Sequence, residues 1–138
     1  MQGYFHYAFS ATARSINHTE FLRQVFEADL SVGGSPYDRA CELWQQILGI
    51  ENVYQIAAKT GLSVAEVVYG KEHVFREHHN MKNPHYYKPR YLKNVDPQTG
   101  AIYAFPYGLP GLDISKPDFG VKVHLVGHSL GGLTAREF

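Results

Sequence analysis

The sequence predicts an α/β fold, of which we expect this chain to contain only a part. Residues 121–126 (VKVHLV) form an apolar run typical of a buried parallel strand. The run leads directly into Gly127-His128-Ser129-Leu130-Gly131, and residues 132–138 can continue as a helix. A strand that turns sharply through Gly-x-Ser-x-Gly into a helix is typical of α/β-hydrolases. Strand, turn and helix together therefore predict a partial α/β-hydrolase fold.

The first element predicted along the chain is a short helix or loop followed by an extended segment, within residues 21–31. The helix breakers at 33–36 come next, where Ser35 can cap a new helix and Pro36 fits its first turn. Apolar side chains then recur at helical spacing until Gly49. They are Ala40, Cys41, Trp44, Ile47 and Leu48. This pattern predicts an amphipathic helix from residue 36 to residue 48.

The remaining elements before the strand follow from periodicity and turn residues. Residues 52–79 are predicted to be mostly helical, with breaks near Gly61 and Gly70. Residues 80–119 are rich in Pro, Gly, Tyr and Asn and show little periodicity. Within them we expect a turn at 96–100, a short strand at 101–105 and another turn at 107–112.

Composition limits the class of protein without defining it. The 13 basic residues balance the 13 acidic residues, so the chain has no excess positive charge for nucleic acid or an acidic membrane surface. A hydrophobic content of 44% fits a soluble globular piece. No apolar run reaches the length of a membrane span, and the sequence itself assigns neither a compartment nor an oligomeric state. The single Cys41 excludes an internal disulfide, and its place in the apolar pattern predicts a buried structural thiol.

Ser129 is the predicted nucleophile. The strained turn should leave no room for side chains at Gly127 and Gly131, where helix and strand approach each other closely. The backbone N–H of Leu130, at the N-terminus of the new helix, is predicted to donate to the developing oxyanion. A glycine-rich connection without chemistry is the alternative, and the flanking strand and helix patterns disfavour it.

The partners that Ser129 needs are expected elsewhere. The α/β-hydrolase fold places its acid and its histidine after the serine, yet Glu137 is the only acid that follows Ser129 here, and no histidine does. We therefore expect residues 1–138 to be a single incomplete domain from the front of a longer enzyme, inactive or nearly so alone. The alternative is a chain that ends at Phe138 and serves as a non-catalytic binding or scaffold protein.

Three motifs in one order extend this prediction to a family. They are YDRACELW at 37–44, VYGKEH at 68–73, and the HSLGG of the serine turn at 128–132. Together they resemble the secreted triacylglycerol lipases of Staphylococcus and thermophilic Bacillus, and their eukaryotic homologues, over roughly residues 25–138 with gaps. The resemblance implies a helical, zinc-subdomain-like insertion over 37–120. It also implies a lipase or carboxylesterase, lipid or ester substrates at a lipid–water interface rather than membrane insertion, and an extracellular location.

The resemblance also implies a structural zinc site with Asp38, His73 and His79 as ligands and a fourth ligand outside this chain. Carboxylate oxygen and imidazole nitrogen are ordinary ligands of tetrahedral zinc. Asp38 has an alternative role, because a carboxylate three residues after Ser35 can complete a helix cap. The lipases also bind calcium, but the resemblance places no calcium site on these residues.

The chain departs from the lipase pattern at several points. The sequence after His79 differs, so His78 or His85 is an alternative second histidine ligand, and the His-Gly-Phe motif near the first strand is missing. Residues 51–66 look like an insertion, and 56–67 resemble a helix-turn-helix. Because the net charge is zero and Lys71 is the one base nearby, we expect a plain helical hairpin and no nucleic-acid binding.

Overall fold

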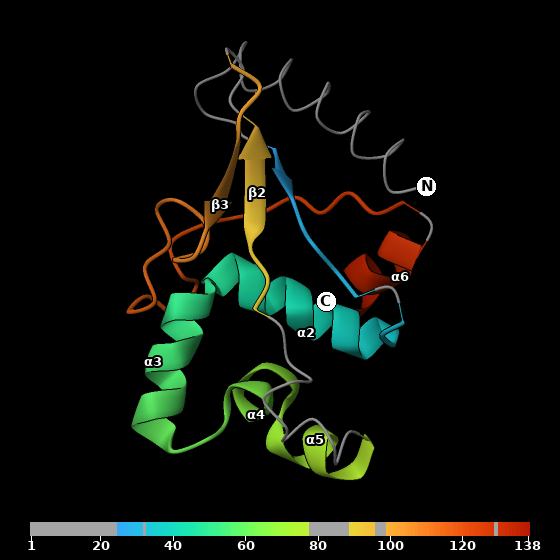
Figure 1. The fold of residues 1–138 in the computed structure, drawn as a ribbon, viewed down its shortest axis with the longest axis vertical. Coiled ribbons are helices and arrows are strands. Elements are labelled where there is room, and N and C mark those ends of the chain that lie inside the picture. The colour runs from blue at the N-terminus through green and yellow to red at the C-terminus, as the bar shows by residue number, and fades with distance from the viewer. Residues whose placement is uncertain (1–24, 32, 78–88, 96–98, 129) are drawn as a thin grey trace.

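A long central helix organises the computed structural model, which describes residues 25–31, 33–77, 89–95, 99–128 and 130–138. Figure 1 shows a small sheet on one side of this helix, α2, and the helices α4 and α5 on the other, with α3 and α6 near its opposite ends. The elements in chain order are β1 (Phe26–Glu27), α2 (Pro36–Leu48), α3 (Ile50–Thr60), α4 (Val64–Tyr69), α5 (Lys71–Glu77), β2 (Leu92–Val95), β3 (Ile102–Phe105) and α6 (Leu130–Glu137).

The predicted helix from 36 to 48 is confirmed, together with its cap. Ser35 Oγ accepts a hydrogen bond from Asp38 N at 3.1 Å, and Asp38 Oδ2 accepts one from Ser35 N at 3.3 Å. This capping box satisfies backbone donors that the first helical turn would otherwise leave without partners. Helix α2 therefore begins at Pro36 for reasons that are local to the sequence.

The expected breaks at Gly61 and Gly70 are also present. Helix α3 ends at Gly61, which adopts the left-handed conformation, and α4 ends at Gly70. Between them, Ser63 and Glu66 form a second capping box that starts α4. The chain from residue 50 to residue 77 is thus three short helices. None of the helices in the described residues is long and apolar enough to span a membrane.

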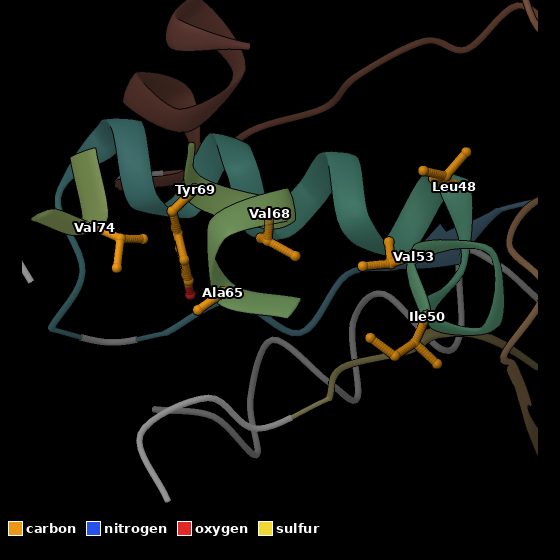
Figure 2. Close-up of a cluster of buried hydrophobic side chains, with 7 residues drawn as sticks. All are labelled: Leu48, Ile50, Val53, Ala65, Val68, Tyr69 and Val74. Carbon is orange, nitrogen blue, oxygen red and sulfur yellow. The ribbon is translucent and has the colours of Figure 1, made fainter. Parts of the chain in front are cut away.

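These short helices close a hydrophobic core against the end of α2. Figure 2 shows the seven buried side chains that form it, with those of α3 at one end and those of α4 and α5 at the other. They are Leu48, Ile50, Val53, Ala65, Val68, Tyr69 and Val74. Cys41 and Trp44 pack against this cluster from α2. The core therefore fixes the helices on which the candidate metal ligands lie.

Helix α2 is buried on more sides than the apolar pattern predicts. Of the apolar residues in that pattern, Ala40 and Leu48 are buried and the others are partly exposed. The polar residues Glu42, Gln45 and Gln46 are buried instead, because each meets backbone groups of neighbouring segments. Gln46 exchanges two hydrogen bonds with the backbone of Asp29, both 2.8 Å. The polar face of α2 thus anchors the strand-bearing segments rather than facing water.

The sheet is antiparallel, with strand order β1-β2-β3. Residues Leu92 to Val95 pair with Phe105 to Ile102, which confirms a short strand in the predicted place. The rings of Phe26 and Phe105 meet edge to face with centroids 5.4 Å apart, and Leu92 is buried. This sheet covers α2, yet its strands are not the parallel strands that the α/β prediction requires.

The prediction of a strand at 121–126 is wrong for this structure, because these residues form no strand. Residues 122–128 are extended and exposed, and Val126 is 84% exposed. A buried parallel strand needs neighbouring strands and covering helices, and the described residues offer it neither. The α/β-hydrolase fold therefore stays a prediction.

The junction of α2 and α3 lies tightly against the turn after β3. An added Cβ on Gly49 would collide with the backbone of Tyr107 and Gly108. Leu109 N donates to Ile47 O at 3.1 Å, and Glu51 N donates to Pro106 O at 2.9 Å. This contact joins the helical part of the chain to the sheet.

We expect Gly49→Ala to destabilise the protein much more than Gly61→Ala. Both glycines have positive φ, but a Cβ on Gly61 would meet nothing within 4 Å. Gly61→Ala is the control, and it should lower the free energy of unfolding by about 1 kcal/mol, from the left-handed conformation alone. Gly49→Ala should lower it by roughly 3 kcal/mol or more, because the backbone must also move. Urea denaturation measures both, and equal losses would show that the junction is not tightly packed.

Candidate functional site

The chain changes from extended to helical around the predicted nucleophile. Ser129 itself lies outside the described residues, but both of its flanks are described. Residues 121–128 are extended, α6 begins at Leu130, and Gly131 N donates to His128 O at 2.9 Å. The predicted helix after the serine is therefore present, and its first residue directly follows Ser129.

The two glycines of the turn differ in their surroundings. A Cβ on Gly127 would collide with the backbone carbonyl of Gly131 and lie 2.6 Å from Gly132 N. This is the close approach of strand segment and helix that the turn requires. At Gly131 a Cβ would meet nothing within 4 Å. The close approach expected at Gly131 is therefore absent from the described residues, which include no neighbouring strand to make it.

Leu130 is the first residue of α6, so its backbone N–H belongs to the first turn of the helix. The N–H groups of a first turn have no partner within their own helix, and the helix dipole favours negative charge beside them. Such an N–H group can stabilise the oxyanion that forms when a serine just before it attacks the carbonyl of a substrate. The described backbone is thus compatible with the predicted role of Leu130.

The structure brings together two of the three residues implied as zinc ligands. Asp38 lies in the first turn of α2 and His73 lies on α5, and a hydrogen bond of 2.9 Å joins His73 Nε2 to Asp38 Oδ1. Asp38 is 5% exposed. Its second oxygen, Oδ2, accepts the hydrogen bond from Ser35 N. The capping role and the metal-ligand role predicted for Asp38 are therefore compatible, because they use different oxygens.

Tyr37 helps to place His73. The two rings lie 4.4 Å apart between centroids at an interplanar angle of 46°. The Tyr37 hydroxyl donates to Tyr69 O at 2.9 Å, which ties the start of α2 to the end of α4. Burial raises the pKa of the Tyr37 hydroxyl, so it stays protonated near neutral pH and remains a donor. The imidazole is thus held in a fixed place beside Asp38.

The donor set fits part of a zinc site. Ligand bonds of about 2.0 to 2.2 Å at a tetrahedral angle put two ligand atoms roughly 3.3 to 3.6 Å apart. The Asp38 and His73 atoms are closer than this because a hydrogen bond of 2.9 Å joins them, so a zinc ion would replace that hydrogen bond. The third implied ligand, His79, lies outside the described residues, as do His78 and His85. Among the residues that the structure describes, no three His, Cys, Asp or Glu side chains are grouped to hold a metal.

Cys41 lies one turn beyond Tyr37 but does not extend this donor set. It is partly buried, packs on the hydrophobic core, and has no disulfide partner. Burial raises the pKa of its thiol. The thiol is accordingly structural, as its position in the sequence pattern predicts.

One contact near the site was not predicted. Arg39 Nε donates to Thr134 Oγ1 at 3.0 Å, and Arg39 Nη1 donates to Ser31 O. Arg39 follows the candidate metal ligand Asp38, and Thr134 lies on the helix that follows Ser129. The pair is separated by 95 residues, so no local pattern reveals it. The one available signal is that Arg39 belongs to the YDRACELW motif.

Comparisons of the chain with models of protein families, with curated proteins and with solved structures found no match. Neither a family nor an activity is therefore assigned by similarity. The interpretation of the site depends on the residues and their geometry.

Proposed function

We propose that this chain is the nucleophile-bearing part of a serine ester hydrolase of the lipase or carboxylesterase class, with Ser129 as nucleophile. The observation that supports this most is the geometry of the residues on the two sides of Ser129. A segment without helix or strand ends at His128, a helix starts at Leu130, and a Cβ added to Gly127 would collide with the backbone of Gly131. A Gly-rich loop without chemistry does not require this close approach of Gly127 to the helix that follows.

In the proposed reaction, Ser129 Oγ attacks the carbonyl carbon of an ester while a histidine takes its proton. The N–H of Leu130 stabilises the oxyanion of the tetrahedral intermediate, which collapses to an acyl-serine and releases the alcohol. Water then hydrolyses the acyl-serine by the same steps. The histidine and its orienting carboxylate would come from residues that follow Ser129 in a longer protein.

Covalent labelling of Ser129 tests this proposal. A fluorophosphonate reacts with an activated serine and leaves ordinary serines unmodified, because only the activated one has a base within reach. The protein should be taken as its own cell produces it, and its intact mass compared with that of this chain. Labelling at Ser129 would support the proposal, and an unlabelled protein of this chain's own mass would favour a non-catalytic scaffold.

We also propose that Asp38 and His73 bind zinc. The support is that a carboxylate and an imidazole, both ordinary zinc ligands, meet here although 35 residues separate them. Zinc would supply a fixed cross-link between α2 and α5, with no part in the ester chemistry. A cation that binds only the folded state stabilises it by about 2.7 kcal/mol at a free concentration of 100 Kd.

Zinc should therefore raise the melting temperature of the wild-type protein but not that of His73→Ala. His124→Ala is the matched control, because His124 is exposed on the extended segment and belongs to no proposed ligand set. Asp38→Asn should also lose the zinc response while an Asn side chain keeps its ability to cap α2. An equal rise in all four proteins, measured by thermal unfolding with and without zinc, would contradict the site.

The helix-turn-helix alternative is not supported by the geometry. The would-be recognition helix is α4, and each of its residues is buried or partly buried against the core. A recognition helix needs an exposed face to enter the major groove of DNA. The α3–α4 pair is better described as a helical hairpin that closes the core.

A further inference from the structure

We propose that Arg39 is a positioning residue for the nucleophile. In this proposal, which rests on the proposed function of Ser129, Arg39 holds helix α6 against the first turns of α2 and so sets where the helix begins. Three observations support it, and none of them involves Ser129 itself.

The first observation is the set of groups that Arg39 joins. Its Nε donates to Thr134 Oγ1 on α6, and its Nη1 donates to the backbone carbonyl of Ser31. The side chain is partly buried on α2, and its guanidinium joins α2 both to Ser31, 8 residues earlier, and to Thr134, 95 residues later. Arg has a rigid planar set of donors, and a Lys could not make both hydrogen bonds in these directions.

The second observation is which side chain of α6 is buried where this helix packs against α2. Among the described side chains of this helix, only Thr134 is buried, at 2% exposed. Leu133 is 49% exposed, and residues 122–128 before the helix are all exposed. Figure 1 shows α6 lying beside one end of α2, joined to the rest by the long extended segment. The one buried side chain among those described in α6 is therefore the one that accepts the hydrogen bond from Arg39.

The third observation is the position of Thr134 relative to the start of the helix. Thr134 follows Leu130 by four residues, which is one turn and about 6 Å along the axis. A tilt of roughly 10° about Thr134 would move the first residue by about 1 Å, and a displacement of that size can cost about 100-fold in rate. A small loosening of the helix at Thr134 would thus displace the backbone N–H of Leu130, the proposed oxyanion donor.

The experiment compares Thr134→Val with Thr134→Ser in the full-length protein. Valine has nearly the shape of threonine without the hydroxyl, whereas serine keeps the acceptor for Arg39. Arg39→Lys is the third variant. Hydrogen exchange of the amides of α6 reports whether the helix is held. The rate of fluorophosphonate bond formation at Ser129, measured separately from probe binding, reports whether the nucleophile is placed.

We expect Thr134→Val and Arg39→Lys to slow bond formation by about 10-fold or more, with probe affinity little changed, and to speed exchange in α6. Thr134→Ser should stay within about twofold of the wild type on both measurements. If Thr134→Val loses stability to urea but keeps wild-type exchange and labelling, the contact is merely structural and the positioning role is wrong. An unlabelled wild-type protein would instead refute the proposed function, and faster exchange in Thr134→Val would still show that Arg39 holds α6.

Discussion

Ser129→Ala should reduce ester hydrolysis by the full-length protein by a factor of roughly 10⁴ to 10⁶. Alanine removes the Oγ that forms the acyl intermediate, and no other group in the turn can replace it. The oxyanion donor at Leu130 would remain and would account for any residual rate. The measurement is kcat/KM on a soluble chromogenic ester, together with loss of fluorophosphonate labelling.

Ser115→Ala is the matched control for this variant. Ser115 lies in an exposed turn, where its hydroxyl and its backbone N–H both bond to Asp113 Oδ1. Its replacement should leave hydrolysis and labelling of Ser129 unchanged. If Ser129→Ala retains the activity of the wild type while the protein stays folded, the nucleophile assignment is wrong.

Helix boundaries were predictable because their causes lie within a few residues. Ser35 and Asp38 form the capping box that begins α2, and Gly49 ends the helix. Gly61 and Gly70 end α3 and α4 in the same way. The sheet was less predictable, because β1 pairs with a strand from the far side of the helical segment. Such pairing depends on which surfaces the helices leave open, and no local pattern encodes that.

The apolar run at 121–126 is a segment whose structure the local sequence pattern did not predict. Its composition fits a buried strand, but whether a segment becomes a strand depends on partners that form its hydrogen bonds. In the described residues those partners are missing, and Val126 is left exposed. A pattern can therefore identify what a segment is suited for without determining its structure in a given chain.

The side-chain contacts at the candidate sites were likewise predictable only in part. The resemblance to the lipases implied that Asp38 and His73 lie close together, although 35 residues separate them. The contact between Arg39 and Thr134 was not expected, because charged side chains at helix surfaces have many possible partners. The buried carboxylate of Glu42, which accepts from Ser31 N and from the Tyr69 hydroxyl, was missed for the same reason. Residue types indicate chemistry, whereas side-chain partners at long range need the structure.

Gly127→Ala should strongly reduce hydrolysis, although by less than loss of the nucleophile, because the new Cβ would collide with the backbone of Gly131. A flexible side chain could turn away from such a contact, but backbone can only move as a whole. The start of α6 would shift by a sizeable fraction of the overlap, and a 1 Å displacement costs about 100-fold in rate. We therefore expect at least a roughly 100-fold fall in kcat/KM, with a parallel fall in the rate of Ser129 labelling.

Gly132→Ala separates this steric effect from a general intolerance of the turn. Gly132 is the third residue of α6, and a Cβ there would meet nothing within 4 Å. Alanine is favoured over glycine inside a helix by roughly 0.5 to 1 kcal/mol, so this variant should be slightly more stable and keep its labelling rate. If Gly127→Ala and Gly132→Ala label Ser129 equally fast, the contact between Gly127 and Gly131 does not shape the turn. A slow Gly127→Ala beside a normal Gly132→Ala would instead tie the reactivity of Ser129 to that one close approach of extended chain and helix.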